Sequence, residues 1–130
     1  MLHSAIGQLE QIDGEDYLIT NEGDEGYVLF GPYEVLDPGS YQVEFFAMPG
    51  EIDGRTCCVV DILRRGRTVA AEKDFTAADL IQRNGLIQLR FEVIARDSYE
   101  YRLMATGSSA LRVRYHRPIR RLPDLDVAPT

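Results

Sequence analysis

The chain has 130 residues, 45% of them hydrophobic, and a formal net charge of −7. This length fits one domain with a hydrophobic core, and the acidic balance excludes the basic footprint of a nucleic-acid-binding protein. No apolar run approaches the roughly 20 residues of a membrane-spanning helix, and the N-terminus does not read as a secretory signal. We therefore expect a soluble, cytoplasmic protein, or a domain of a longer chain, that binds neither nucleic acid nor membrane.

The first half of the chain reads as short strands separated by turns. Alternating and β-branched or aromatic residues predict strands at 4–10, 17–20, 27–30 and 40–48. Asp37-Pro38-Gly39 forms a turn before the last of them, because Pro38 fixes φ near −65° and Gly39 admits a left-handed conformation. The strand 40–48 then has two different faces. One face carries Tyr41, Val43, Phe45 and Ala47, and the other carries Gln42, Glu44, Phe46 and Met48.

The second half continues in strands, with one exception. Strands are predicted at 56–63, 68–73, 86–94, 99–105 and 111–115, and the first two are joined by a tight hairpin with Gly66. Residues 74–85 have helical spacing, with Thr76 as a cap and Gly85 as the end, and we expect a short helical crossover there. We expect one domain over residues 1–117 and a loose, proline-rich C-terminal extension over 118–130.

Short strands with turn signals every 8–12 residues are typical of an all-β fold. We predict an antiparallel β-sandwich of jelly-roll type with the one helical crossover. Its core is expected to consist of alternating inward residues of these strands: Val28, Phe30, Tyr41, Val43, Phe45, Val60, Ile62, Val69, Leu89, Phe91, Val93, Tyr101, Leu103, Leu111 and Val113.

The two cysteines, Cys57 and Cys58, are adjacent. Neighbours on a strand point to opposite faces, so we expect no disulfide between them, but one buried thiol and one partly exposed thiol.

The order of core and turn residues resembles a known kind of domain. The pattern "GY…FGPY…L.PGSYQVEFFA", then "VVDI…G…VA…F" and a closing "LRVRY", is similar to jelly-roll carbohydrate-binding modules. More narrowly, it resembles the "GPY..L.PG.Y.V" β-sandwich domains associated with bacterial glycosyltransferases and related surface-polysaccharide proteins. The resemblance covers residues 5–115 and implies a saccharide ligand. The chain has no Trp, so Tyr and Phe are the rings available to stack on a sugar.

The alternation also predicts a polar face on the outside of the sheets, made of Asp61, Arg90, Glu92, Glu100, Arg102, Arg112, Arg114 and His116, with Glu44 beside them. Such a face is either a solvated surface with cross-strand ion pairs or a shallow groove that binds hydroxyls or an acidic sugar. Under the second interpretation, the candidate ligand-binding residues are Tyr33 and Tyr99 for stacking and Arg90, Glu92 and Arg102 for hydrogen bonds.

The sequence shows no motif for catalysis or for a resident cofactor. Two histidines, His3 and His116, are too few for a cupin-type metal site, and no phosphate loop, zinc ligand set or nucleophile elbow is present. The acidic loops 13–16, 22–25 and 51–53 leave structural calcium open, but none has the ligand spacing of an EF-hand. We therefore expect a protein that is not an enzyme and has no cofactor and no metal site.

Two functions remain from different classes. The first is a non-catalytic carbohydrate-recognition module, accessory to bacterial polysaccharide synthesis or modification. The second is a protein-interaction or homo-oligomerisation domain without a small ligand, in which Phe46, Met48 and Val59 form an exposed apolar patch at a homodimer interface.

Overall fold

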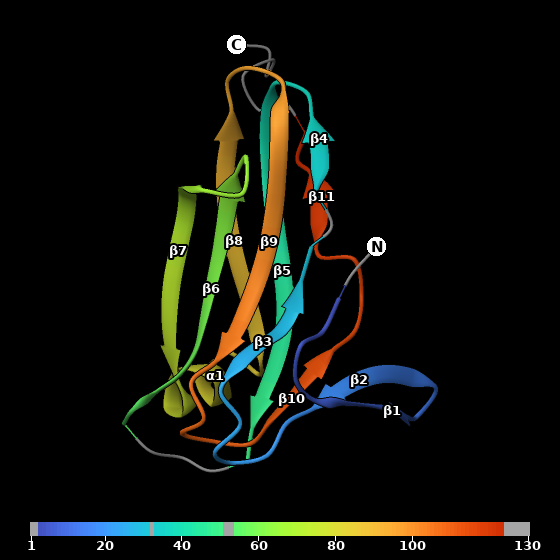
Figure 1. Cartoon of the computed structure of the whole chain (residues 1–130), viewed down its shortest axis with the longest axis vertical. Helices are drawn as coiled ribbons and strands as arrows, with labels where there is room; N and C mark the ends of the chain where they lie inside the picture. Colours follow the sequence, from blue (N-terminus) through green and yellow to red (C-terminus); the bar gives the residue numbers. More distant parts are fainter. Residues whose placement is uncertain (1–2, 32, 51–53, 124–130) are drawn as a thin grey trace.

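The computed structural model describes residues 3–31, 33–50 and 54–123. Two antiparallel sheets face each other, and one short helix connects them at one end (Figure 1). The predicted all-β antiparallel sandwich with one helical crossover is confirmed.

In sheet one, β3 and β4 both pair with β9, β9 pairs with β6, and β6 pairs with β7. Its strands are β3 (Gly26–Phe30), β4 (Glu34–Leu36), β9 (Asp97–Ala105), β6 (Thr56–Arg64) and β7 (Thr68–Thr76). Sheet two is built around β5. Its strands are β1 (Gln8–Ile12), β2 (Glu15–Ile19), β10 (Leu111–Arg114), β5 (Gly39–Pro49), β8 (Leu86–Val93) and β11 (Ile119–Arg121).

Strand β5 is bonded along both edges. One edge pairs with β8 over Gly39 to Phe46, and the other pairs with β11 near Val43 and with β10 near Ala47. Its predicted two-faced character is confirmed, because Tyr41, Val43, Phe45 and Ala47 are all buried against sheet one.

The core between the sheets contains every predicted residue except Phe30 and Val69. A register shift in β3 between Tyr27 and Leu29 leaves Leu29 facing inward, so Phe30 lies opposite Arg102 on the outer side. A second shift, where Ile62 and Leu63 of β6 pair with Ala71 and Val69 of β7, leaves Ala70 without a partner and Val69 52% exposed. Both errors have the same cause, since a bulge breaks the alternation on which the prediction rested.

A third irregularity explains the cysteines. The register of β6 also shifts between Thr56 and Cys58, and both thiols are fully buried, which corrects the expectation of one exposed thiol. Both cysteines are free. The neighbouring Cys57 and burial together raise the pKa of the Cys58 thiol far above its usual range, which is typical of an inert structural cysteine.

The loose C-terminal extension, expected from residue 118, was predicted to begin too early in the chain. Strand β11 pairs with β5 through Ile119, Arg120 and Arg121, and Ile119 is only 5% exposed. The sandwich therefore continues past the expected boundary at residue 117, because this short segment covers an edge of β5 that would otherwise be open. Residues 124–130 lie outside the described part of the chain.

The predicted crossover is helix α1 (Ala77–Gln82), which follows β7 and precedes β8. The Thr76 hydroxyl accepts from the backbone N–H of Asp79 at 3.1 Å, and the Asp79 carboxylate accepts from the N–H of Thr76 at 2.9 Å. This reciprocal capping box satisfies backbone donors at the helix start. In the described part of the chain, no helix is long and apolar enough to cross a membrane.

The cap gives a first prediction. Thr76→Ala removes the side-chain acceptor of the capping box, and we expect the free energy of unfolding to fall by about 1 kcal/mol. Thr68→Ala is the matched control, since Thr68 is an exposed residue of the same strand. Urea denaturation of both variants measures the difference, and equal losses would contradict a capping role.

The same cap makes the free energy of unfolding depend on pH. The N–H and hydroxyl of Thr76 lower the pKa of Asp79 from its ordinary value of 3.8. A lowered folded-state pKa stabilises the protein at pH values above the unfolded pKa, and this contribution is lost as pH falls below about 4. Comparing wild type with Asp79→Asn by urea denaturation at pH 6 and pH 3.5, we expect the gap between them to shrink at the lower pH. A gap that stays constant would contradict this.

Candidate functional site

The residues predicted to form one polar face lie on two separate faces, on opposite sides of the molecule. Asp61, Glu100 and Arg102 belong to sheet one, because β6 and β9 lie side by side there. Arg90, Glu92, Arg112, Arg114 and Glu44 belong to sheet two. The candidate residues Arg90 and Glu92 therefore do not share a surface with Arg102.

Arg102 is occupied by a partner in its own sheet. Its guanidinium donates to both oxygens of Asp61, with a distance of 2.7 Å from Nε to Oδ1, and lies 4.7 Å from the centre of the Tyr27 ring. The hydrogen bond with Asp61 raises the pKa of Arg102. This cross-strand ion pair is largely withdrawn from solvent, and it leaves Arg102 engaged within its own sheet.

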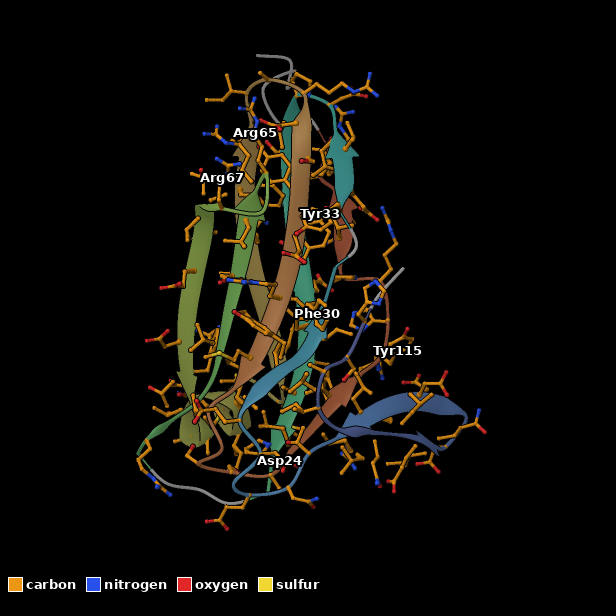
Figure 2. The ribbon with its side chains drawn as sticks, in the orientation of Figure 1. Asp24, Phe30, Tyr33, Arg65, Arg67 and Tyr115 are labelled. Atoms are coloured by element: carbon orange, nitrogen blue, oxygen red, sulfur yellow. The ribbon has the colours of Figure 1, made fainter. Side chains whose placement is uncertain are left out.

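The two predicted stacking residues have different outcomes. Tyr33 is 64% exposed and lies beside Gly66 of the β6–β7 hairpin, where a Cβ on Gly66 would be 3.1 Å from its hydroxyl (Figure 2). Tyr99 is 3% exposed, and its ring packs on Phe91 with a centroid distance of 5.3 Å. We therefore correct the stacking role of Tyr99. Strand β9 is regular there, so Tyr99 and Tyr101 both face the core.

The outer face of sheet two brings together a larger constellation, which we call the sheet-two face. It consists of outward side chains from β2, β5, β8, β10 and β11: Tyr17, Gln42, Glu44, Phe46, Gln88, Arg90, Arg112, Arg114 and Arg120. Directly opposite residues of paired strands share a face. This places Arg90 beside Gln42, Gln88 beside Glu44, and Arg114 beside Tyr17.

A hydrogen-bonded row crosses the middle of this face. Glu44 Oε1 accepts from Gln42 Nε2 at 2.6 Å, from Gln88 Nε2 at 3.1 Å and from Arg120 Nη2 at 3.5 Å. Arg90 Nε donates to the side-chain amide oxygen of Gln42, Oε1, at 3.2 Å. Because Gln42 is only 2% exposed, its amide is fixed and orients the exposed ends of Gln88 and Arg90.

Aromatic rings and guanidinium groups form the end of the face near β2. The rings of Tyr17 and Phe46 meet edge to face at 6.3 Å, and the Arg114 guanidinium lies 5.4 Å from the Phe46 ring. Arg112 lies 5.3 Å from the Tyr17 ring. Arg114 also forms a salt bridge with Glu15, and its Nε is a buried donor for which the described residues provide no hydrogen-bond partner.

Two hollows flank the arginines. One of about 360 Å³ is lined by Ile19, Thr20, Met48, Pro49, Gly50, Ala110, Leu111 and Arg112. The other, of about 320 Å³, is lined by Glu15, Asp16, Arg114, Tyr115 and His116. The face therefore offers rings, fixed amides and guanidinium donors beside open space, which is the chemistry needed to hold a polyhydroxylated ligand. Among residues 3–31, 33–50 and 54–123, no cluster of three or more His, Cys, Asp and Glu could hold a metal ion. The acidic loop 51–53 lies outside the described residues.

Sequence reasoning missed Tyr17, Gln42 and Gln88. Tyr17 alternates with the buried Leu18 in β2, which was a signal that its ring faces outward. The neighbours of Tyr17 come from β5 and β10, about 30 and 100 positions later, and no local pattern reveals such a pairing. The predicted apolar patch also does not form as one surface: Phe46 and Met48 lie on sheet two, whereas Val59 pairs with Met104 on the outer side of sheet one.

No protein-family model and no curated protein matches the chain. A solved structure described as "CBM4 structure and function" matches it with a TM-score of 0.54 at 10% sequence identity. The alignment covers 93% of this chain and 93% of that chain. At this identity the likeness shows the fold, and it bears out the jelly-roll sandwich expected from the sequence.

Gly85 provides a test of how the face is supported. Its φ is +81°, and an added Cβ would lie 2.9 Å from both Met48 Sδ and the Phe46 ring. Gly14 has a φ of +83° but no atom within 4 Å of such a Cβ. Replacing each with Ala introduces the same backbone strain, so we expect Gly85→Ala to cost at least about 1 kcal/mol more in urea denaturation. Equal losses in the free energy of unfolding would mean that the Phe46 and Met48 side chains move aside without cost.

Proposed function

We propose that this protein is a non-catalytic carbohydrate-binding module that holds a glycan against the sheet-two face. The observation that carries the proposal is the combination of a ring cluster and a fixed polar row on one open sheet of a CBM4-like sandwich. CBM denotes a carbohydrate-binding module, and the solved neighbour is named as one.

The rings supply the apolar part of the recognition. Tyr17 and Phe46 are half-buried, so each keeps a surface for the C–H face of a sugar while its other side is packed. Arg112 and Arg114 lie against these rings. Such contacts hold a guanidinium in place, and less conformational freedom remains to be lost when it binds a hydroxyl.

The polar row supplies direction. Gln88 and Arg90 are exposed, yet each is tied to a buried or half-buried partner on β5. Donors and acceptors whose geometry is fixed before binding match a rigid, repeating hydroxyl pattern better than free side chains would.

The engaged carboxylates favour binding over catalysis. Glu44 accepts from three donors, and Glu15 is paired with Arg114. These contacts suit carboxylates that orient their neighbours rather than an acid and base acting on a glycosidic bond. The role that fits is accessory: the module keeps a polysaccharide near an enzyme that builds or modifies it.

A glycan screen followed by NMR titration tests this proposal. We expect saturable chemical-shift changes in β2, β5, β8 and β10, and Tyr17→Ala and Arg90→Ala should each weaken binding about tenfold. Tyr33→Ala is the matched control, because it removes an exposed tyrosine from the loop between β3 and β4, away from sheet two. A screen without binders, or a loss with Tyr33→Ala that equals the loss with Tyr17→Ala, would overturn the sheet-two site.

A further inference from the structure

A cavity of about 340 Å³ lies at the end of the sandwich, apart from the ring cluster. It is lined by residues of the β6–β7 hairpin, the end of β8, the following loop and the start of β9: Arg64, Arg65, Glu92, Ile94, Ala95, Asp97 and Tyr99. The cavity thus brings together two of the residues singled out from the sequence: Glu92, which is exposed as predicted, and Tyr99, which is buried instead of exposed.

Tyr99 places a hydroxyl at this cavity. The side chain is 3% exposed, and the structure gives the hydroxyl no hydrogen-bond partner among residues 3–31, 33–50 and 54–123. This hydroxyl is not among the buried polar atoms that lack a partner in the described residues, so the oxygen itself reaches the open space that Tyr99 lines. A molecule in the cavity can therefore form a hydrogen bond with it.

The walls of the cavity are held in place. The Arg65 N–H donates to Ser98 O at 2.9 Å, and the Arg65 guanidinium pairs with Asp97 at 2.9 Å. This contact lowers the pKa of Asp97. The Ser40 hydroxyl holds Glu92 from the other side. The hairpin and β9 therefore form a fixed rim at the end of the sandwich where Arg65 lies (Figure 2).

Arg64 remains as a cation without a bonded partner. Within the described residues, its guanidinium forms no hydrogen bond and no salt bridge, and it lines the same cavity as Glu92 and Tyr99. A free guanidinium binds a carboxylate through two parallel hydrogen bonds. Glu92 has a second oxygen that accepts from no described residue, and this oxygen suits a hydroxyl donor.

We propose that this end cavity is a second binding site that takes a single hexuronic acid, or the uronic acid at the end of a glycan chain. Its volume is at the lower limit of ligand pockets, which fits one sugar ring rather than an oligosaccharide. The ligand carboxylate pairs with Arg64, and ring hydroxyls bond to Glu92 and to the Tyr99 hydroxyl. The charge on Asp97 is taken up by Arg65, so it does not oppose the ligand.

Titration with D-glucuronate and D-glucose, followed by NMR of the labelled protein, tests this site. We expect glucuronate to shift residues 92–99 saturably and to bind about tenfold more tightly than glucose. Arg64→Gln should abolish this preference, whereas Tyr99→Phe should weaken glucuronate binding about fivefold. Arg67→Gln is the control for Arg64→Gln, because Arg67 lies on the same hairpin but does not line the cavity.

Each other outcome counts against the site. Equal binding of glucose and glucuronate overturns the uronic acid, and no saturable shift at 92–99 overturns the cavity. Equal effects of Arg64→Gln and Arg67→Gln would mean that glucuronate binds through the general positive charge of the hairpin, which overturns a specific role of Arg64. Urea denaturation of the Tyr99→Phe variant checks that it remains folded, so that a loss of binding is not a loss of structure. The glucuronate-induced shifts at 92–99 should persist in Tyr17→Ala while glycan-induced shifts at the sheet-two face are lost, so failure of the sheet-two face and failure of the end cavity remain distinguishable.

Discussion

The backbone hydrogen bonds along both edges of β5 are the constraint on which the rest of this structure depends. Strand β8 occupies one edge, and β10 and β11 divide the other. Gln42, an outward residue of β5, is thereby flanked by Arg90 of β8 on one side and by Arg120 of β11 on the other. This is why Gln42 is nearly inaccessible although it points away from the core. The face of sheet two is a layered surface rather than a set of separate side chains in water.

The same strand couples the core to the surface. Phe45 and Ala47 pack inward between Glu44, Phe46 and Met48, which point outward. A slip of one residue in the register would exchange these sets, burying a carboxylate and exposing rings. Stability of the sandwich and geometry of the face are therefore specified together. Helix α1 contributes to both, since its capping box fixes the crossover and Gly85 after it lies beneath Phe46.

Much of the fold could be predicted from the sequence, because alternation and turn residues are local signals. The two faces of residues 40–48, the helical crossover and most of the core follow from period-2 and period-3.6 spacing. The errors fall at bulges at Val28, Cys57 and Ala70, where one extra residue reverses the alternation. The site was harder. Arg90 and Glu92 lie on sheet two, Arg102 and Tyr33 on sheet one, and Tyr99 points inward, because the assignment of strands to sheets depends on long-range pairing.

The buried pair Cys57 and Cys58 has a practical consequence. Thiolate reagents need an accessible, ionised sulfur, and these two thiols lie in a central strand flanked by β7 and β9. Alkylation in native buffer therefore requires β6 to separate from β7 and β9. When closing is faster than the chemistry, the labelling rate follows the population of the opened molecule. The rate at which the native cysteines are alkylated thus reports how often the sandwich opens. A cysteine introduced on the surface could be labelled selectively, because the native pair does not react while the protein is folded.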